Sequence, residues 1–83
     1  FRYFELSAKE GNEFSQYYVA LCLFKGFGVQ ANREESFKWY MKCALQGNME
    51  GQYNVGNNLV LIHRKMTDEA RKWFRKAEIQ GRN

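Results

Sequence analysis

One segment of this chain recurs at a fixed spacing, and the repeat constrains the fold more than any single residue does. A shift of the 83-residue sequence by 36 positions aligns residues 8–12 with residues 44–48, and residues 16–19 with residues 52–55. A shift by 34 aligns Trp39 and its neighbours with Trp73, so the second copy is about two residues shorter. A period in the mid-thirties is typical of a solenoid of stacked helical units, and solenoids mostly build binding surfaces.

The spacing of apolar residues predicts five helices. We expect them at about residues 1–9, 13–25, 33–46, 49–62 and 67–80. Asn12 and Asn32 are predicted N-caps, because an Asn side chain can accept a hydrogen bond from a free N–H of the first turn. Glycine is favoured where a helix ends or a turn needs a left-handed residue. Such positions are Gly11, Gly26, Gly28, Gly47 and Gly81.

These elements predict an all-α, right-handed α-α superhelix, with residues 1–83 as a single solenoid unit. Residues 1–10 are expected to end one repeat, residues 11–46 to form a full repeat and residues 47–80 to form a second, trimmed repeat. Residues 81–83 would begin the next repeat. Because the chain opens on Phe1 and not on Met, we expect a fragment of a longer array.

The two helices of each repeat differ in polarity. Residues 13–25 are apolar almost all round, which indicates an inner helix that is covered on more than one side. Residues 49–62 form the matching inner helix of the second copy. Residues 33–46 are amphipathic, as expected for an outer helix. On the outer helices, Trp39 and Trp73 are predicted to fill the seam between neighbouring helix pairs.

The motifs of residues 11–47 follow one another in a familiar order: Gly-Asn, Ser-Gln-Tyr, Gly-x-Gly-Val, Trp-Tyr and Gln-Gly. This pattern resembles the Sel-one-like repeat (SLR), a relative of the tetratricopeptide repeats, and the resemblance implies a scaffold or adaptor that holds other proteins. The second copy departs from it after Ile62, where both glycines and the valine are absent. The pattern and the internal repeat together mark these structural positions: Gly11, Ala20, Gly26, Gly28, Trp39, Tyr40, Ala44, Gly47, Trp73 and Gly81.

The sequence carries no catalytic pattern. The single histidine, His63, stands beside two basic residues and is expected to be a solvated turn residue. No Ser/His/Asp set, paired carboxylates or phosphate-binding glycine loop is visible. One histidine and two distant cysteines do not fit a zinc site, and we expect Cys22 and Cys43 to be buried free thiols. The sequence therefore predicts no enzyme activity, no metal and no cofactor.

Charge and composition narrow the class of partner. The formal net charge is +4, but acidic residues alternate with the basic ones on the outer helices, which favours a solvated face over a specific nucleic-acid site. No apolar stretch reaches the length of about 18 residues that a membrane span needs. Two cysteines and the lack of an Asn-x-Ser/Thr sequon favour a reducing compartment such as the cytoplasm.

The inner helices carry the candidate partner-binding surface, on the face that would line the concave groove. Its predicted residues are Phe14, Tyr17, Leu21, Phe24, Lys25, Tyr53 and Asn57. An aromatic groove with a few polar groups suits a protein or peptide partner. The alternative is that neighbouring inner helices bury this face. The predicted function is a non-enzymatic protein-interaction scaffold. An assembly module that self-associates through its ends and a regulatory appendage of a larger enzyme stay open as alternatives.

Overall fold

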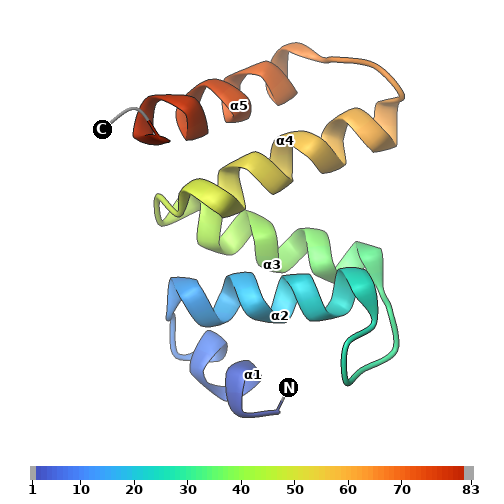
Figure 1. Ribbon diagram of the computed structural model, residues 1–83, viewed down its shortest axis with the longest axis vertical. Coiled ribbons are helices and arrows are strands. Elements are labelled where there is room, and N and C mark those ends of the chain that lie inside the picture. Colours follow the sequence, from blue (N-terminus) through green and yellow to red (C-terminus); the bar gives the residue numbers. More distant parts are fainter. Residues whose placement is uncertain (1, 82–83) are drawn as a thin grey trace.

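The computed structural model describes residues 2–81, with the side chains of residues 4–80. It contains five helices: α1 (Arg2–Lys9), α2 (Glu13–Lys25), α3 (Arg33–Leu45), α4 (Met49–His63) and α5 (Asp68–Gly81). Each helix packs on the next, so the five form a row with α1 and α5 at its two ends (Figure 1). The predicted all-α helical repeat is confirmed. Phe1, expected to start the first helix, and residues 82–83 lie outside the described part.

The helix starts follow the predicted capping scheme, with one displacement. The Oδ1 atoms of Asn12, Asn32 and Asn48 each accept a hydrogen bond from the backbone N–H three residues on, at 2.7–3.0 Å. In the second copy Met66 aligns with Asn32 and cannot cap. Thr67 takes over, because its Oγ1 accepts from the Ala70 N–H at 3.1 Å. The cap of α5 has therefore moved by one residue.

The ends of α2 and α4 differ more than their sequences suggest. α2 has 13 residues and ends on Gly26, which adopts the left-handed conformation with φ of 80°. α4 has 15 residues and continues through Leu61 and Ile62 to His63. It then ends on Arg64, whose φ of 55° makes it the one non-glycine residue with positive φ within residues 2–81. A side chain in this conformation costs about 1–2 kcal/mol, so the trimmed turn is strained.

Small residues at matching positions let the helices approach closely. Ser15 and Ala20 of α2 are buried, and the 36-residue shift aligns them with Gly51 and Gly56 of α4, which are also buried. A Cβ atom added to Gly51 would lie 3.0 Å from the amide nitrogen of Ala44, which is tighter than ordinary contact. Small residues therefore allow close helix packing in both copies.

Trp39 and Trp73 occupy equivalent positions on the outer helices, but they are buried to different extents. Trp39 is 7% exposed and Tyr40 is 1% exposed, and both belong to the hydrophobic core. Trp73 is only partly buried and packs against the edge of that core. The Lys42 ammonium lies 4.3 Å from the Trp39 ring centroid, and Lys76 lies 4.7 Å from that of Trp73. Each repeat therefore places a lysine over its tryptophan.

A buried glutamine in each inner helix joins three helices. The Gln16 side-chain amide donates to the Ala8 carbonyl oxygen at 3.2 Å, and its Oε1 accepts from Gln46 at 2.7 Å. In the second copy Gln52 donates to the Ala44 carbonyl at 3.4 Å and accepts from Gln80 at 2.7 Å. Because buried polar groups are costly unless paired, these bridges fix the register of the outer helices on both sides.

The two cysteines are free thiols. Cys43 is fully buried, and its Sγ donates to the Tyr40 carbonyl oxygen at 3.2 Å. Burial raises the pKa of this thiol to about 11 from an ordinary 9.0. Cys22 is only partly buried, so the prediction that both thiols are buried is wrong for Cys22.

Candidate functional site

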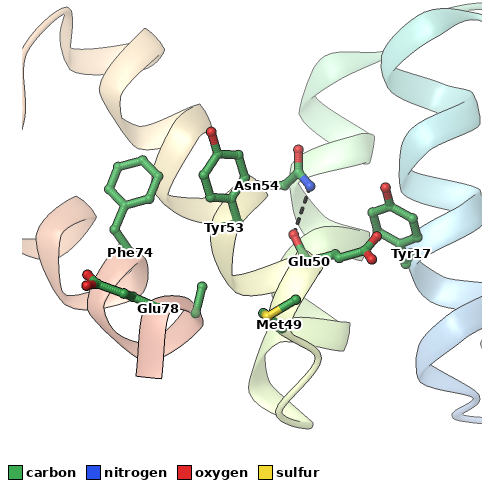
Figure 2. A pocket seen from close by; sticks show the side chains of 8 residues that line it. Tyr17, Met49, Glu50, Tyr53, Asn54, Phe74 and Glu78 are labelled. Carbon is green, nitrogen blue, oxygen red and sulfur yellow. Dashed lines mark hydrogen bonds between the residues drawn. The ribbon is translucent and has the colours of Figure 1, made fainter. Parts of the chain in front are cut away.

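A cavity with a volume of about 630 Å³ extends over α4 from α5 on one side to α2 on the other (Figure 2). Its lining residues are Tyr17, Met49, Glu50, Tyr53, Asn54, Phe74, Ala77 and Glu78. Residues from both copies of the repeat meet here, because Tyr17 comes from α2 of the first copy and the other lining residues come from α4 and α5 of the second. The cavity is thus a product of repeat stacking and not of any one helix.

Aromatic rings form one wall of this cavity. The rings of Tyr53 and Phe74 lie edge to face, with centroids 5.4 Å apart. The same contact occurs one repeat earlier, between Tyr17 and Tyr40 at 5.9 Å, because the sequence shifts align Tyr17 with Tyr53 and Tyr40 with Phe74. Tyr53 nevertheless remains 55% exposed. A large, half-open aromatic ring on a rigid helix is well suited to pack against a ligand side chain.

Carboxylates supply the polar part of the cavity. Burial, and then the neighbouring Glu50 carboxylate with its hydrogen bond, raise the pKa of the Tyr17 hydroxyl. Figure 2 shows the Glu50 side chain directed toward Tyr17, while Asn54 donates to the Glu50 backbone carbonyl at 2.8 Å. Glu78 lines the side formed by α5. The cavity combines apolar rings with two carboxylates, a composition suited to recognising a peptide side chain.

Two of the seven residues predicted to bind a partner line this cavity, namely Tyr17 and Tyr53. Phe24 does not, because it packs toward α3, where the Arg33 guanidinium lies 4.5 Å from its ring centroid. The Lys25 ammonium lies 5.9 Å from the ring centroid of Phe27 in the following turn. These contacts direct the carboxyl end of α2 toward α3 and its connecting loop.

The other three predicted residues also lie outside the cavity lining. Phe14 is 67% exposed, Leu21 is partly buried, and Asn57 is exposed. The expectation that α2 is covered on more than one side is therefore too strong at Phe14, and also at Tyr18, which is 49% exposed. Tyr18 stacks on Phe4 of α1 with centroids 4.9 Å apart and stays half exposed beside it.

Sequence reasoning missed the part of the cavity that α5 contributes. The lining residues outside the predicted set of seven are Met49, Glu50 and Asn54 of α4, and Phe74, Ala77 and Glu78 of α5. A signal was present for one of them, because the 34-residue shift aligns Phe74 with Tyr40, the partner of Tyr17. Aligning both aromatic positions would have paired Tyr53 with Phe74.

The preceding repeat shows what packs on the same outer-helix positions. Cys43 and Ala44 of α3 align with Ala77 and Glu78 of α5. On α3 these positions are covered by α4, because a Cβ atom added to Gly51 would meet Cys43 and Ala44. Ala77 is likewise buried, at 6% exposed, but Glu78 is exposed where Ala44 is 2% exposed. The side of α5 that carries Glu78 is therefore open where the equivalent side of α3 is covered.

Other chemistry has little support in the part of the chain that the structure describes. Residues 2–81 contain no group of three or more His, Cys, Asp or Glu side chains placed to hold a metal ion. His63 is exposed at the end of α4. No described helix is both long and apolar enough to cross a bilayer.

The Sel1 repeat model matches residues 1–12, 14–48 and 67–81, and this chain belongs to the Sel1 repeat family. The match omits residues 49–66, which are α4 and the turn that lacks glycine. Sel1 repeats generally act as protein–protein interaction modules. The predicted family and solenoid fold are confirmed.

Two curated relatives carry the name "DAP3-binding cell death enhancer 1". The rat protein is 41% identical over 51 residues, which cover 61% of this chain and 10% of the relative. The mouse protein is 36% identical over 47 residues, covering 57% of this chain and 9% of the relative. The matched part of this chain thus spans about a tenth of the length of these relatives.

Two solved structures share the fold. A Sel1 repeat protein from Oxalobacter formigenes superposes with a TM-score of 0.76 at 34% identity, covering 86% of this chain and 30% of that protein. A protective antigen of uropathogenic Escherichia coli strains, described as an SLR fold, gives a TM-score of 0.81 at 38% identity. It covers 96% of this chain and 18% of the antigen.

Proposed function

We propose that this chain is a non-enzymatic scaffold that binds a peptide or helix of a partner protein in the cavity beside Tyr17, Tyr53 and Phe74. The cavity carries the proposal. It opens on the face of the inner helices, offers an exposed aromatic ring on a rigid helix, and has carboxylates beside it. Interfaces take most of their binding energy from a few such aromatic anchors.

A direct test uses purified DAP3 as the first probe, because both curated relatives are named for binding it. Titration calorimetry would compare the chain with Tyr53→Ala, and with Leu45→Ala as a matched control. Leu45 is 72% exposed on α3 and does not line the cavity. An anchor role predicts that Tyr53→Ala weakens binding by more than 1 kcal/mol, about fivefold or more, whereas Leu45→Ala has little effect.

If DAP3 does not bind, that partner is excluded, and selection from a displayed peptide library tests the surface itself. Selected peptides should shift the NMR signals of Tyr53, Asn54 and Phe74. Peptides that map only to other surfaces, or affinities that do not change in Tyr53→Ala, would reject the cavity as the binding site. Equal losses for Tyr53→Ala and Leu45→Ala would reject it as well.

A second candidate function is assembly by self-association, which the open side of α5 favours. On α3 the position equivalent to Glu78 is covered by α4, whereas on α5 both Glu78 and the neighbouring Ile79 are exposed. A helix exchanged between copies could cover this side. Sedimentation over a wide concentration range should show reversible dimers that Ile79→Arg abolishes. A monomer at millimolar concentration would exclude this candidate and leave partner binding untouched.

A further inference from the structure

A second surface groove lies at the opposite end of α4, away from the aromatic cavity. It has a volume of about 410 Å³ and lies between the first turns of α3 and the last turns of α4. Its lining residues are Arg33, Glu34, Phe37, Lys38, Asn58, Leu61 and Ile62. The two cavities share no lining residue. Both walls belong to helices in the interior of the row, so the groove is complete within the described chain (Figure 1).

The apolar wall of this groove exists only because the second repeat departs from the first. The 36-residue shift aligns Leu61 and Ile62 with Lys25 and Gly26, which are the polar end and the turn glycine of α2. Leu61 is helical, as Lys25 is in the first repeat, and the two extra residues of α4, Ile62 and His63, place Ile62 on the helix as well. Leu61 is 54% exposed and Ile62 is 62% exposed. The segment omitted from the Sel1 match includes both residues.

Exposed aliphatic side chains at the end of the inner helix are not a general feature of this repeat. In the first repeat, Lys25 and Gly26 end the inner helix without any exposed aliphatic residue. The second repeat keeps its longer helix although Arg64 must adopt a left-handed conformation at its end. Together with the partly buried Phe37, the two aliphatic residues form an apolar patch that is open to solvent. Adjoining exposed apolar residues of this kind mark interaction sites.

The charges around the patch favour an acidic occupant. Arg33 and Lys38 line the groove, and Arg64 and Lys65 follow directly after α4 and are exposed. Two carboxylates partly offset these four cations. Glu34 lies in the lining, and the Glu35 carboxylate lies 3.7 Å from the Lys38 ammonium. The lining of the groove itself carries one more cation than anions, and Arg64 and Lys65 add two cations at the end of α4 before the acidic first turn of α5, Asp68 and Glu69. The aromatic cavity, by contrast, is lined by two glutamates and no basic residue. Opposite charge selects partners and speeds their encounter.

We propose that this groove is a second docking surface that binds an acidic segment of a partner protein. Branched or aromatic side chains of that segment pack on Phe37, Leu61 and Ile62, and its carboxylates approach Arg64 and Lys65. This inference goes beyond the proposed function and does not depend on it, because the opposite end of α4 and a different ligand chemistry are involved.

The probes are three fluorescein-labelled peptides that differ in one property at a time. The first has leucine and phenylalanine anchors among aspartates and glutamates. The second keeps the anchors and replaces every acid by lysine, and the third keeps the acids and replaces every anchor by serine. Fluorescence anisotropy should show that the first binds at least tenfold more tightly than either of the others. Its affinity should fall with added salt, because ions screen exposed charges.

The matched variant is Leu61→Lys/Ile62→Gly, which introduces the residues found at the aligned positions of the first repeat. It should weaken binding of the acidic peptide at least tenfold, while Tyr53→Ala in the aromatic cavity should leave it within about twofold. Circular dichroism shows whether the double variant folds. If it does not, Arg64→Glu/Lys65→Glu removes the charge complementarity without touching the packing, and should weaken binding to a similar degree.

Several results would overturn the proposal. They are equal binding of the acidic and basic peptides, unchanged affinity in the groove variants, and no detectable binding of the acidic peptide at low salt. NMR signal shifts confined to Tyr53 and Phe74 would assign the peptide to the aromatic cavity instead. Concentration-dependent dimerisation that Leu61→Lys/Ile62→Gly abolishes would make a second copy of the chain the occupant, and would also overturn it.

Discussion

Replacing Trp39 with alanine should lower the free energy of unfolding by about 3–5 kcal/mol. The side chain is 7% exposed, so the substitution removes almost all of its packing. A tryptophan of this kind buries about 200 Å², which at about 25 cal/mol per Å² corresponds to roughly 5 kcal/mol. A chain of this length is typically stable by about 4–12 kcal/mol, so the loss is a large part of the total.

Trp73 offers a control that differs mainly in burial. It aligns with Trp39 and carries Lys76 over its ring at 4.7 Å, against 4.3 Å for Lys42 over Trp39, but it is only partly buried. Because the cation contacts are alike, the difference between the two alanine variants reports the buried area. We expect Trp73→Ala to cost about half as much, roughly 1.5–2.5 kcal/mol.

Urea denaturation followed by far-ultraviolet circular dichroism measures both losses. If Trp39→Ala is already unfolded without urea, Trp39→Leu leaves part of the packing and keeps the transition measurable. Equal losses for Trp39→Ala and Trp73→Ala would refute the argument that burial in the row of helices sets the magnitude. An unchanged midpoint for Trp39→Ala would refute its place in the core.

Three other substitutions test the packing, the strained turn and the buried thiol. Gly51→Ala should destabilise the chain by about 1–3 kcal/mol, because the new Cβ would lie 3.0 Å from the Ala44 nitrogen, and a urea melt no lower than the wild type would contradict this. Arg64→Gly should raise stability by about 1 kcal/mol, since glycine adopts a φ of 55° without strain, whereas Lys65→Gly should bring no gain in the same melts. The Cys43 thiol has a pKa of about 11 when folded against an ordinary 9.0, so between these values the unfolded chain loses its proton first. Stability should therefore fall by about 2–3 kcal/mol as pH rises through this window, and melts of Cys43→Ala over the same pH range should lack that part of the slope.

The sequence alone determined the fold class, because the signals for it are local and repeated. Asn12 and Asn32 cap their helices as predicted, since a cap depends only on a side chain and the N–H group three residues later. The buried position of Trp39 followed equally well from its place on an amphipathic helix within a repeat.

The binding surface could not be derived in the same way. The inner helix α2 is apolar almost all round, so its sequence does not show which of its faces a neighbour covers. Burial depends on where the adjoining helices lie: Phe24 packs toward α3, Phe14 stays exposed, and Tyr17 reaches the cavity over α4. A cavity with walls from α2, α4 and α5 is a long-range property, and no window of sequence contains it.

The second repeat shows the same division at smaller scale. The sequence shows that the turn after α4 lacks both glycines, but it does not show which backbone conformation the turn adopts without them. Tertiary structure decided that α4 runs on to His63, that Arg64 takes the left-handed position and that Thr67 becomes the new cap. The reason is physical: α5 must pack on α4 in the repeat's register. In the short connection between the two helices, Arg64 therefore adopts a strained conformation. Leu61 and Ile62 remain exposed on α4.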